Sequence, residues 1–431
     1  MGKSFYIETF GCQMNVLDSE KMSGTLQTAG FIETDDPLKA DLIVFNTCSI
    51  REKAEQKFFS RLGRFKLIKK RNPNLKIAVA GCIAQQQGPM ILRRSPFVDM
   101  VLGPQNIHLL AKLGNNGSGK LACDDNTEIA ELEYVTSRKD KVKALVTIMY
   151  GCNNYCSYCV VPYTRGPERS RPSKKILAEI NKLTNKGYKE VTLLGQNVNS
   201  YRSDIGFPEL LYEINKIEAL ERIRFVTSHP KDLSDDLIIA MRDLDKVCEH
   251  IHLPLQSGSS SILKHMNRRY TYDNYLQKII KLRSEMPRIA ITADIISGFP
   301  QETEDDHSAT LKALEEVAFD GIFAFKYSPR SGTAAIKLDG HVDEEIKSRR
   351  LNEIIELQNK ITDTKNKLLE GTTQQVLIDY YANGDKSIMT GRTSTNKIVN
   401  ISYDGKNSVN GLISVRILKA NRHSLDGELI V

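Results

Sequence analysis

The sequence predicts an α/β protein in three parts: an N-terminal parallel-sheet βα domain, a central partial (βα)6 barrel and a small C-terminal antiparallel β-barrel. Two observations predict the first two parts. Short apolar strands alternate with helical stretches, and they fall into two series separated by a stretch of linker composition. The third follows from short alternating segments broken by Asn-Gly and Asp-Gly turns. We expect domains at residues 1–118, 138–368 and 369–431, which fits a chain of 431 residues.

Composition narrows the class of protein. Charged residues make up 26% and hydrophobic residues 40% of the chain, and no apolar run is long enough to span a membrane. The N-terminus lacks an apolar signal region, so we expect a cytoplasmic protein without a membrane partner. Thiols stay reduced there, which favours metal ligands or spare thiols over disulfides for the eight cysteines. The net charge of +7 permits a nucleic-acid partner without requiring one.

The first hundred residues repeat one unit three times: a short apolar strand, a turn with a cysteine and a helical stretch. The strands are SFYIETFGC, ADLIVFNTC and KIAVAGC, and they end in Cys12, Cys48 and Cys82. In a parallel sheet the functional crevice lies outside the carboxyl ends of the strands. We therefore expect the three cysteines to lie together there. The run GNNGSGK at 114–120 and the acidic stretch after it predict a linker.

A second series of six strands follows the linker. The strands are KALVTIMYGC, EVTLLGQN, RIRFVTSHP, HIHLPLQSG, AITADIISGFP and GIFAFKYSPRSG, each followed by enough chain for a helix. Six such units predict a barrel related to the (βα)8 architecture with fewer strands, open on one side to a large substrate. A charged helical stretch at about 341–369 then leads to the strands QQVLIDYY, KIVNISY and ISVRILKA of the last barrel.

Three cysteines on one tight loop carry the firmest chemical signal. Cys152, Cys156 and Cys159 directly follow an apolar strand in MYGCNNYCSYC. Three thiolates bind three irons of a [4Fe-4S] cluster and leave the fourth open. S-adenosylmethionine (SAM) can chelate that iron, and an electron from the cluster then breaks its sulfonium bond to give a 5′-deoxyadenosyl radical. A zinc site is the alternative, but structural zinc prefers paired C-x2-C knuckles and a fourth ligand that this loop lacks.

The triad Cys12, Cys48 and Cys82 predicts a second cluster of the same kind. A single cysteine at a strand end is often a buried structural residue. Three at the same place in consecutive βα units favour a shared [4Fe-4S] cluster, again with one open iron. Cys123 and Cys248 share no such pattern, and we interpret both as incidental.

Together these motifs resemble the radical SAM methylthiotransferases over essentially the whole chain. The matching segments are TFGCQMNVLDSEKM, FNTCSIREKAEQK, AGCIAQQ, YGCNNYCSYCVVPYTRGPERSR, LLGQNVNSY, HLPLQSGSSSILKHMNRRYT and ADIISGFPQET. The last domain, with GRTSTNKIV at 391–399, resembles the TRAM RNA-binding domain, and the barrel resembles the radical SAM barrel. GCQMN and GPQNIHLL are similar to the MiaB branch, which acts on tRNA.

The resemblance implies a reaction, cofactors and partners. The substrate would be tRNA containing N6-isopentenyladenosine at position 37, which receives a methylthio group at adenine C2. Two [4Fe-4S] clusters and SAM are implied, with the second cluster as sulfur carrier. An electron donor such as a flavodoxin is implied as well, and we expect a monomer. The alternative substrates are a threonylcarbamoyladenosine tRNA and a ribosomal-protein aspartate. A noncatalytic iron–sulfur protein that binds RNA or carries electrons is the alternative of a different class.

Polar residues at the strand ends of the barrel are further candidates, because ligand-binding loops gather there. We expect contacts to SAM or the substrate base from Gln196, Asn197, Ser228, Gln256, Ser257, Gly298 and Glu302. Contacts to the SAM carboxylate or tRNA phosphates are expected from Arg165, Arg268 and Arg269, and RNA contacts in the last domain from Arg392 and Lys397. The other cations of that domain are Arg416, Lys419 and Arg422. The alternatives are ordinary turn and cap residues, and solvated surface cations.

Overall fold

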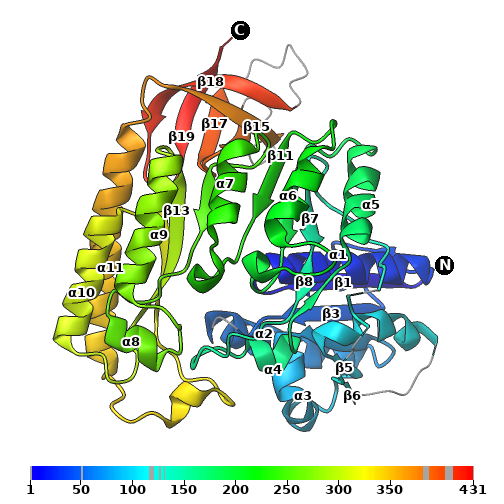
Figure 1. Cartoon of the computed structure of the whole chain (residues 1–431). Helices are drawn as coiled ribbons and strands as arrows, with labels where there is room; N and C mark the ends of the chain where they lie inside the picture. Colours follow the sequence, from blue (N-terminus) through cyan, green and yellow to red (C-terminus); the bar gives the residue numbers. More distant parts are fainter. Residues whose placement is uncertain are drawn as a thin grey trace.

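The computed structural model describes residues 2–49, 52–115, 121–125, 128–130, 132–381, 388–402 and 411–430. Three parts follow one another along the chain (Figure 1). The N-terminal sheet lies below the central barrel on the right of the view, and the C-terminal barrel lies above it. No helix of the described residues is long and apolar enough to cross a membrane.

The N-terminal part is a parallel sheet between two layers of helices. Its strand order is β2-β1-β3-β4-β5-β6. The strands are β1 (Ser4–Thr9), β2 (Ile32–Glu33), β3 (Leu42–Thr47), β4 (Lys76–Gly81), β5 (Met100–Leu102) and β6 (Leu121–Ala122). The helices are α1 (Gln13–Thr28), α2 (Glu52–Arg71), α3 (Cys82–Arg94) and the 3-10 helix η1 (Pro104–Asn115). The three predicted βα units are confirmed as β1–α1, β3–α2 and β4–α3.

Alternation along β3 explains why helices cover both faces of this sheet. Ile43 and Phe45 pack with Phe58 of α2 on one face, whereas Leu42 and Val44 pack with Leu26 of α1 on the other. Successive side chains of a strand point to opposite faces, so a strand that is apolar throughout is buried on both. Strand β6 lies beyond residue 118, so the sheet extends past the predicted domain limit. Of the predicted linker, 116–120 lie outside the described residues.

The central part is the predicted partial barrel, and all six expected strands are present. Two parallel sheets, β7-β10-β11 and β12-β13-β14, are linked by a parallel bridge between Ile223 and Val247. The strands are β7 (Lys143–Thr147), β10 (Glu190–Leu194), β11 (Arg222–Phe225), β12 (His250–His252), β13 (Ala290–Ser297) and β14 (Gly321–Lys326). No pairing joins β7 to β14 among the described residues, so the barrel is open.

Helices cover the convex face of the barrel (Figure 1). They are α5 (Ser173–Thr184), α6 (Phe207–Asn215), α7 (Asp235–Asp243), α8 (Ser260–His265), α9 (Tyr272–Glu285) and α10 (Glu304–Val317). The shorter elements are β8 (Met149–Tyr150), α4 (Val161–Arg165), β9 (Arg169–Ser170), η2 (Val198–Ser200), η3 (Pro230–Asp232) and η4 (Ala334–Lys337). The predicted charged helix is α11 (Glu344–Lys367), which runs along the edge of the barrel toward the C-terminal part.

The C-terminal part is the predicted small β-barrel, closed in the order β15-β16-β17-β19-β18. Its strand pairs are antiparallel as predicted, except that β17 and β19 pair in parallel. Its strands are β15 (Thr373–Tyr381), β16 (Ile388–Thr393), β17 (Ile398–Ser402), β18 (Leu412–Ala420) and β19 (Leu425–Leu429). The inward residues form one apolar core, which includes Val376, Met389, Val399, Val415 and Ile417. Three strands follow the predicted segments, whereas β16 and β19 were not expected.

Two arginines of β11 attach the C-terminal barrel to the central one. Arg222 donates to the carbonyls of Gln375 and Arg392 at 2.7 and 2.5 Å. Arg224 donates to the carbonyls of Thr393 and Ser394 at 2.6 and 3.0 Å. Part of the segment 391–399, which resembles the TRAM RNA-binding domain, therefore contacts the central barrel.

The pair formed by Arg224 and Glu190 predicts a large loss of stability on substitution. The two side chains are 3.0 Å apart, with exposures of 7% and 3%. Arg224→Met leaves a buried carboxylate without its cation, so we expect the free energy of unfolding to fall by about 3–5 kcal/mol. Chemical denaturation measures this. Arg416→Ala, which removes an exposed cation of β18, is the control and should stay within about 0.5 kcal/mol of wild type. An equal loss in both variants would contradict the assigned role.

Candidate functional site

The three-cysteine loop runs from the end of β8 to the start of α4. Gly151 opens it with φ of +73°, and a Cβ there would meet the carbonyl oxygen of Pro167 at 2.0 Å. Cys152 donates its N–H to the Gly166 carbonyl at 3.2 Å, and Cys159 donates to the Cys156 carbonyl at 2.9 Å. These backbone bonds fold the loop back on itself, and Cys152, Cys156 and Cys159 all line one cavity.

Arg268 is a cation that lies beside this loop. Its Nη1 lies 3.4 Å from Sγ of Cys156, and Nη2 donates to the Pro254 carbonyl at 2.9 Å. Burial raises the pKa of Cys152, and it raises that of Cys159 to about 12. Buried thiols of this kind stay protonated until iron displaces their protons. The structure therefore places the predicted Arg268 beside the cysteines themselves.

The donor set of the loop fits an iron–sulfur cluster better than a single metal ion. In the described part of the chain, no three His, Cys, Asp or Glu side chains surround one ion position. A [4Fe-4S] cluster binds each thiolate through a different iron, so its ligands need not converge on one point. Three thiols that line one cavity satisfy this looser requirement.

The cavity beside the loop has a volume of about 290 Å³ and carries polar atoms ready for a ligand. Oγ of Ser228, Nε2 of His229 and Oε1 of Gln256 are buried there, and none has a hydrogen-bond partner among the described residues. Buried polar groups without partners are costly, which favours a polar ligand that satisfies them. Three such atoms fit SAM, with its amino, carboxylate and adenosine groups.

Backbone strain marks the same cavity. Thr227 and Gln256 line it with φ of +69° and +76°, in the region that favours glycine. The backbone of Gln256 forms hydrogen bonds with the backbone of Asp294 and Ile296, and these bonds hold this conformation. Strained residues of this kind concentrate at functional sites. Gln196 also lines the cavity, and its side chain accepts the N–H of Gly151 at 2.5 Å, which connects the second strand end to the cysteine loop.

Four of the residues expected to contact SAM or the substrate base lie outside the lining of this cavity: Asn197, Ser257, Gly298 and Glu302. The Ser257 hydroxyl lies 3.4 Å from that of Thr310. Asn197 donates to Asp232 at 2.7 Å. Glu302 accepts from the N–H of Gly298 at 2.7 Å and from Arg350 at 2.8 Å, and its side chain is 2% exposed. Glu302 thus closes the turn after β13 and anchors α11. His229 and Asp294 also line the cavity and were not among the expected residues, although both lie in the strand-end segments SHP and TADIISG.

The second triad lies at the carboxyl ends of three adjacent parallel strands. Cys12 is the N-cap of α1, Cys48 follows β3, and Cys82 begins α3. The close approach needs Gly11, because a Cβ there would lie 2.4 Å from Cβ of Cys48. Helix N-termini stabilise thiolates. A hydrogen bond with the Cys48 side chain, assisted by the charge of Arg165, lowers the pKa of Cys12 to about 6.

Arg165 connects the two triads. It is the last residue of α4, directly after the Cys152 loop, and its guanidinium lies 2.8 Å from Asp18 of α1, with exposures of 5% and 4%. Burial alone lowers the pKa of Arg165, but Asp18, Cys82 and Cys12 raise it well above its usual range. Arg165 does not line the cavity beside the Cys152 loop, whereas Ser49, next to Cys48, does. Both triads therefore face the same junction between the N-terminal sheet and the barrel.

Arg269 and the cations of the last domain divide into two groups. Arg269, Arg416, Lys419 and Arg422 are exposed or partly exposed, and Arg422 pairs with Asp363 at 2.7 Å. Arg392 instead donates to Asn396, and Lys397 lies 3.4 Å from Asp320 of the central barrel. Lys397 is thus engaged in the domain junction, and Arg392 in the turn beside it.

His229 predicts an acid-sensitive step in stability. Burial and the nearby charges of Arg268 and Lys231 lower the pKa of His229 to about 2. Below about pH 6.5 the unfolded chain binds a proton that the folded chain does not, so this group destabilises the fold by up to about 1.4 kcal/mol per pH unit. His229→Gln should remove that part of the slope between about pH 6.5 and 5.5. Urea unfolding of both proteins measures it, and equal slopes would contradict the assignment.

Comparisons with known proteins cover all three parts of the chain. Residues 4–103 match "Uncharacterized protein family UPF0004", residues 146–314 the Radical SAM superfamily, and residues 367–430 the TRAM domain. A protein of Thermodesulfovibrio yellowstonii named tRNA-2-methylthio-N(6)-dimethylallyladenosine synthase is 57% identical over 431 residues, which is 100% of this chain and 99% of that relative. A protein of the same name from Clostridium botulinum is 49% identical over 99% of this chain and 97% of its own length.

Solved structures agree on the fold. The radical SAM methyltransferase TsrM from Kitasatospora setae matches with a TM-score of 0.57 and 13% identity, over 78% of this chain and 74% of TsrM. The cobalamin-dependent radical enzyme OxsB matches with a TM-score of 0.52 and 13% identity, over 84% of this chain and 56% of OxsB. At this identity the likeness shows the fold alone.

Fold, cysteine loop and domain matches define a radical SAM enzyme with a C-terminal TRAM domain. Its relatives share its full length at 47–57% identity under one name. The chain belongs to the family of the tRNA-2-methylthio-N(6)-dimethylallyladenosine synthases. The resemblance found in the sequence is thereby confirmed.

Proposed function

We propose that this chain inserts a methylthio group at C2 of N6-isopentenyladenosine 37 in tRNA. Full-length identity to synthases of that name is the observation that carries the proposal. The geometry supports it, because two cysteine triads meet at one junction. The adenine C2–H bond has no acid–base route to substitution, so a radical initiator and a sulfur donor suit the reaction.

The first triad and its cavity hold the initiating chemistry in this proposal. Cys152, Cys156 and Cys159 bind a [4Fe-4S] cluster, which together with SAM supplies the radical when both are bound. Ser228, His229 and Gln256 offer the buried polar atoms that orient SAM. Arg268 offsets the negative charge of the thiolates, since it already lies 3.4 Å from Cys156.

The second triad holds the sulfur-carrying centre. Cys12, Cys48 and Cys82 bind a second [4Fe-4S] cluster. Two helix N-termini and Arg165 favour the thiolate form that iron binding needs. The ion pair of Arg165 with Asp18 fixes α4 against α1, so the spacing of the two triads is set by a buried contact.

The proposed function also implies the partners of the protein. The substrate is tRNA carrying the isopentenyl nucleoside, and a flavodoxin-like protein in the cytoplasm supplies electrons to a monomeric enzyme. Residues 1–118 carry the second triad, 138–368 form the barrel and 369–431 the RNA-binding domain, and β6 returns to the first sheet. A TRAM match at 367–430 supports RNA contact by the last of these.

Mass spectrometry of nucleosides tests the proposed function. Reconstituted protein, SAM, sulfide and a reductant are incubated with tRNA that carries N6-isopentenyladenosine, and the tRNA is then digested. We expect the 2-methylthio derivative of that nucleoside. Its absence, together with modification of a ribosomal protein or of threonylcarbamoyladenosine tRNA offered in parallel, would replace this substrate by one of the alternatives. Absence of any SAM cleavage would favour a noncatalytic protein.

A further inference from the structure

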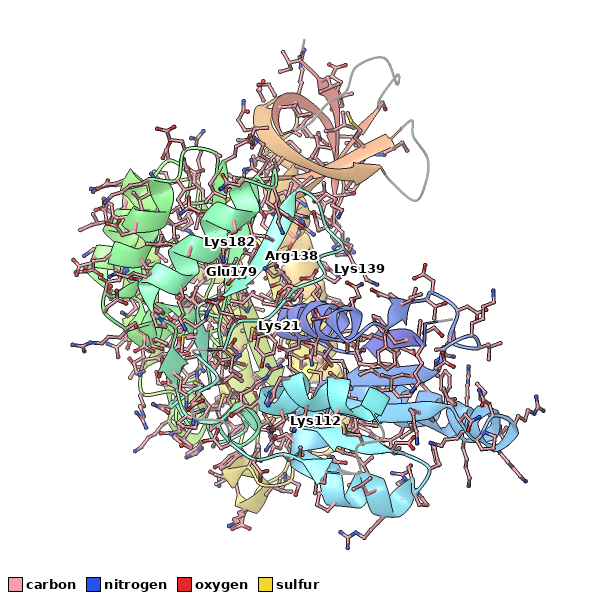
Figure 2. The ribbon with its side chains drawn as sticks, turned by 90° about the vertical axis from the view of Figure 1, so that its right-hand side faces the viewer. Lys21, Lys112, Arg138, Lys139, Glu179 and Lys182 are labelled. Carbon is pink, nitrogen blue, oxygen red and sulfur yellow. The ribbon has the colours of Figure 1, made fainter. Side chains whose placement is uncertain are left out.

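A second cavity, separate from the reaction cavity, lies where α1 passes α5. Its volume is about 320 Å³, and segment 132–136 with Arg138 closes it from the linker side. The lining contains more cations than acids: the cations are Lys21, Arg138, Arg171, Lys175, Lys182 and Lys186, and the acids are Glu133 and Glu179. Figure 2 shows Lys21, Arg138, Glu179 and Lys182 gathered on one face, with Lys139 to their right and Lys112 below them. This cavity therefore attracts anions.

Lys21 forms the inner wall of the cavity and is unusual among the lining residues because it is both charged and buried. It is 8% exposed, although it carries a charge. Its Nζ lies 3.2 Å from the hydroxyl of Tyr150 and 5.2 and 5.4 Å from the ring centroids of Tyr134 and Tyr150. No carboxylate pairs with it among the described residues. An ammonium is rarely buried without an anion, so the wall lacks a negative partner.

Tyr134 gives a second, independent indication. Its hydroxyl oxygen is buried and has no hydrogen-bond partner within the described part of the chain. Like Lys21, it can donate to an acceptor that enters the cavity. Donors without acceptors are the complement of phosphate oxygens, which only accept.

The remaining charges favour the same class of ligand. Glu179 already pairs with Arg138 at 2.9 Å and with Arg171 at 2.8 Å. Glu179, one of the two acids of the lining, is thus paired with two arginines. Lys182 and Lys186 stand exposed on α5 and at its end, at the rim. A ligand with more than one negative group can contact wall and rim together.

We propose that this cavity is a phosphate-binding site and that the tRNA backbone is its occupant. The choice of tRNA rests on the proposed function, which supplies a polyanion. Lys21 lies nine residues along α1 from Cys12, or about 13 Å along the helix axis. A few nucleotides of one stem-loop span that distance. Phosphate contacts of this kind fix the register of a nucleic acid without reading its sequence.

Two charge reversals on α5 and a matched control test the site. Lys182→Glu/Lys186→Glu alters the rim, whereas Lys174→Glu reverses an exposed lysine of the same helix that does not line the cavity. Binding of fluorescent tRNA to the full reconstituted chain is measured over a range of salt. We expect the double variant to bind about tenfold more weakly, with a salt slope smaller by about 1–2. The control should bind within about twofold of wild type.

A second arm separates the two sources of phosphate. Pyrophosphate should raise the Tm of the wild type and the control, and fail to raise that of the double variant or of Lys21→Met, which keeps the aliphatic stem. Protection by pyrophosphate with unchanged tRNA affinity would overturn the tRNA occupant and retain a site for a small phosphorylated ligand. If the double variant matches the control in both arms, the site is overturned. Failure to form the methylthio nucleoside while tRNA binding follows these expectations would refute the proposed function alone.

Discussion

Replacing Cys152, Cys156 and Cys159 together by alanine should abolish SAM cleavage. These three cysteines line the cavity that contains Ser228 and Gln256, so their loss removes the ligands of the proposed cluster that would transfer the electron. We expect iron to fall by about four atoms per chain, and 5′-deoxyadenosine to drop below detection. Iron analysis and chromatography of the reductant-treated protein measure both effects.

The control for this variant is Cys248→Ala. Cys248 is buried near Arg222 and Arg224, outside both triads. Its substitution tests whether loss of any buried thiol disrupts the barrel. It should retain full iron and SAM cleavage. Cleavage that persists in the triple variant would show that the cluster of this loop does not initiate the chemistry.

Replacing Cys12, Cys48 and Cys82 together by alanine should separate the two halves of the reaction. The Cys152 loop is held by its own backbone bonds and by Arg268, so we expect it to keep about four irons and to cleave SAM. Methylthio product should disappear, because the variant lacks the ligands of the proposed sulfur-carrying centre. Iron content, SAM cleavage and nucleoside analysis on one preparation measure all three.

Cys123→Ala is the matched control for the second triad. Cys123 follows β6 of the same sheet, with Sγ 3.5 Å from the Ala84 carbonyl, yet it does not cap a helix of the triad. It should leave product formation intact. Retention of about eight irons by the triple variant would contradict a cluster on Cys12, Cys48 and Cys82.

Much of the fold could be predicted, because strands that are buried in a parallel sheet have continuous apolar sequences. Strands β3, β4 and β10 are of this kind. Strand β6 has only two residues within a stretch of linker composition. In β16, Gly391 interrupts the alternation, because a Cβ there would meet the Leu377 carbonyl at 2.4 Å. The pairing that makes these segments strands comes from distant parts of the chain.

The cysteines of the site could be predicted from spacing, whereas its polar contacts could not. Gln196, Ser228 and Gln256 were correctly placed at the cavity by the rule for strand ends. The same rule also selected Glu302, which pairs with Arg350, a residue 48 positions away. Whether a polar side chain faces a ligand or a helix depends on such long-range partners. For the same reason Arg165 was expected to meet SAM or tRNA and instead meets Asp18.

The central claim is that both triads of one chain act on one substrate at one junction. Mixing the two triple-alanine variants tests it most directly. Each mixture member retains one triad, and nucleoside mass spectrometry reads the product from tRNA, SAM, sulfide and reductant. We expect no 2-methylthio nucleoside from the mixture, although wild-type protein at the same concentration forms it. Product from the mixture would contradict the claim, because it would show that the two centres act on separate molecules.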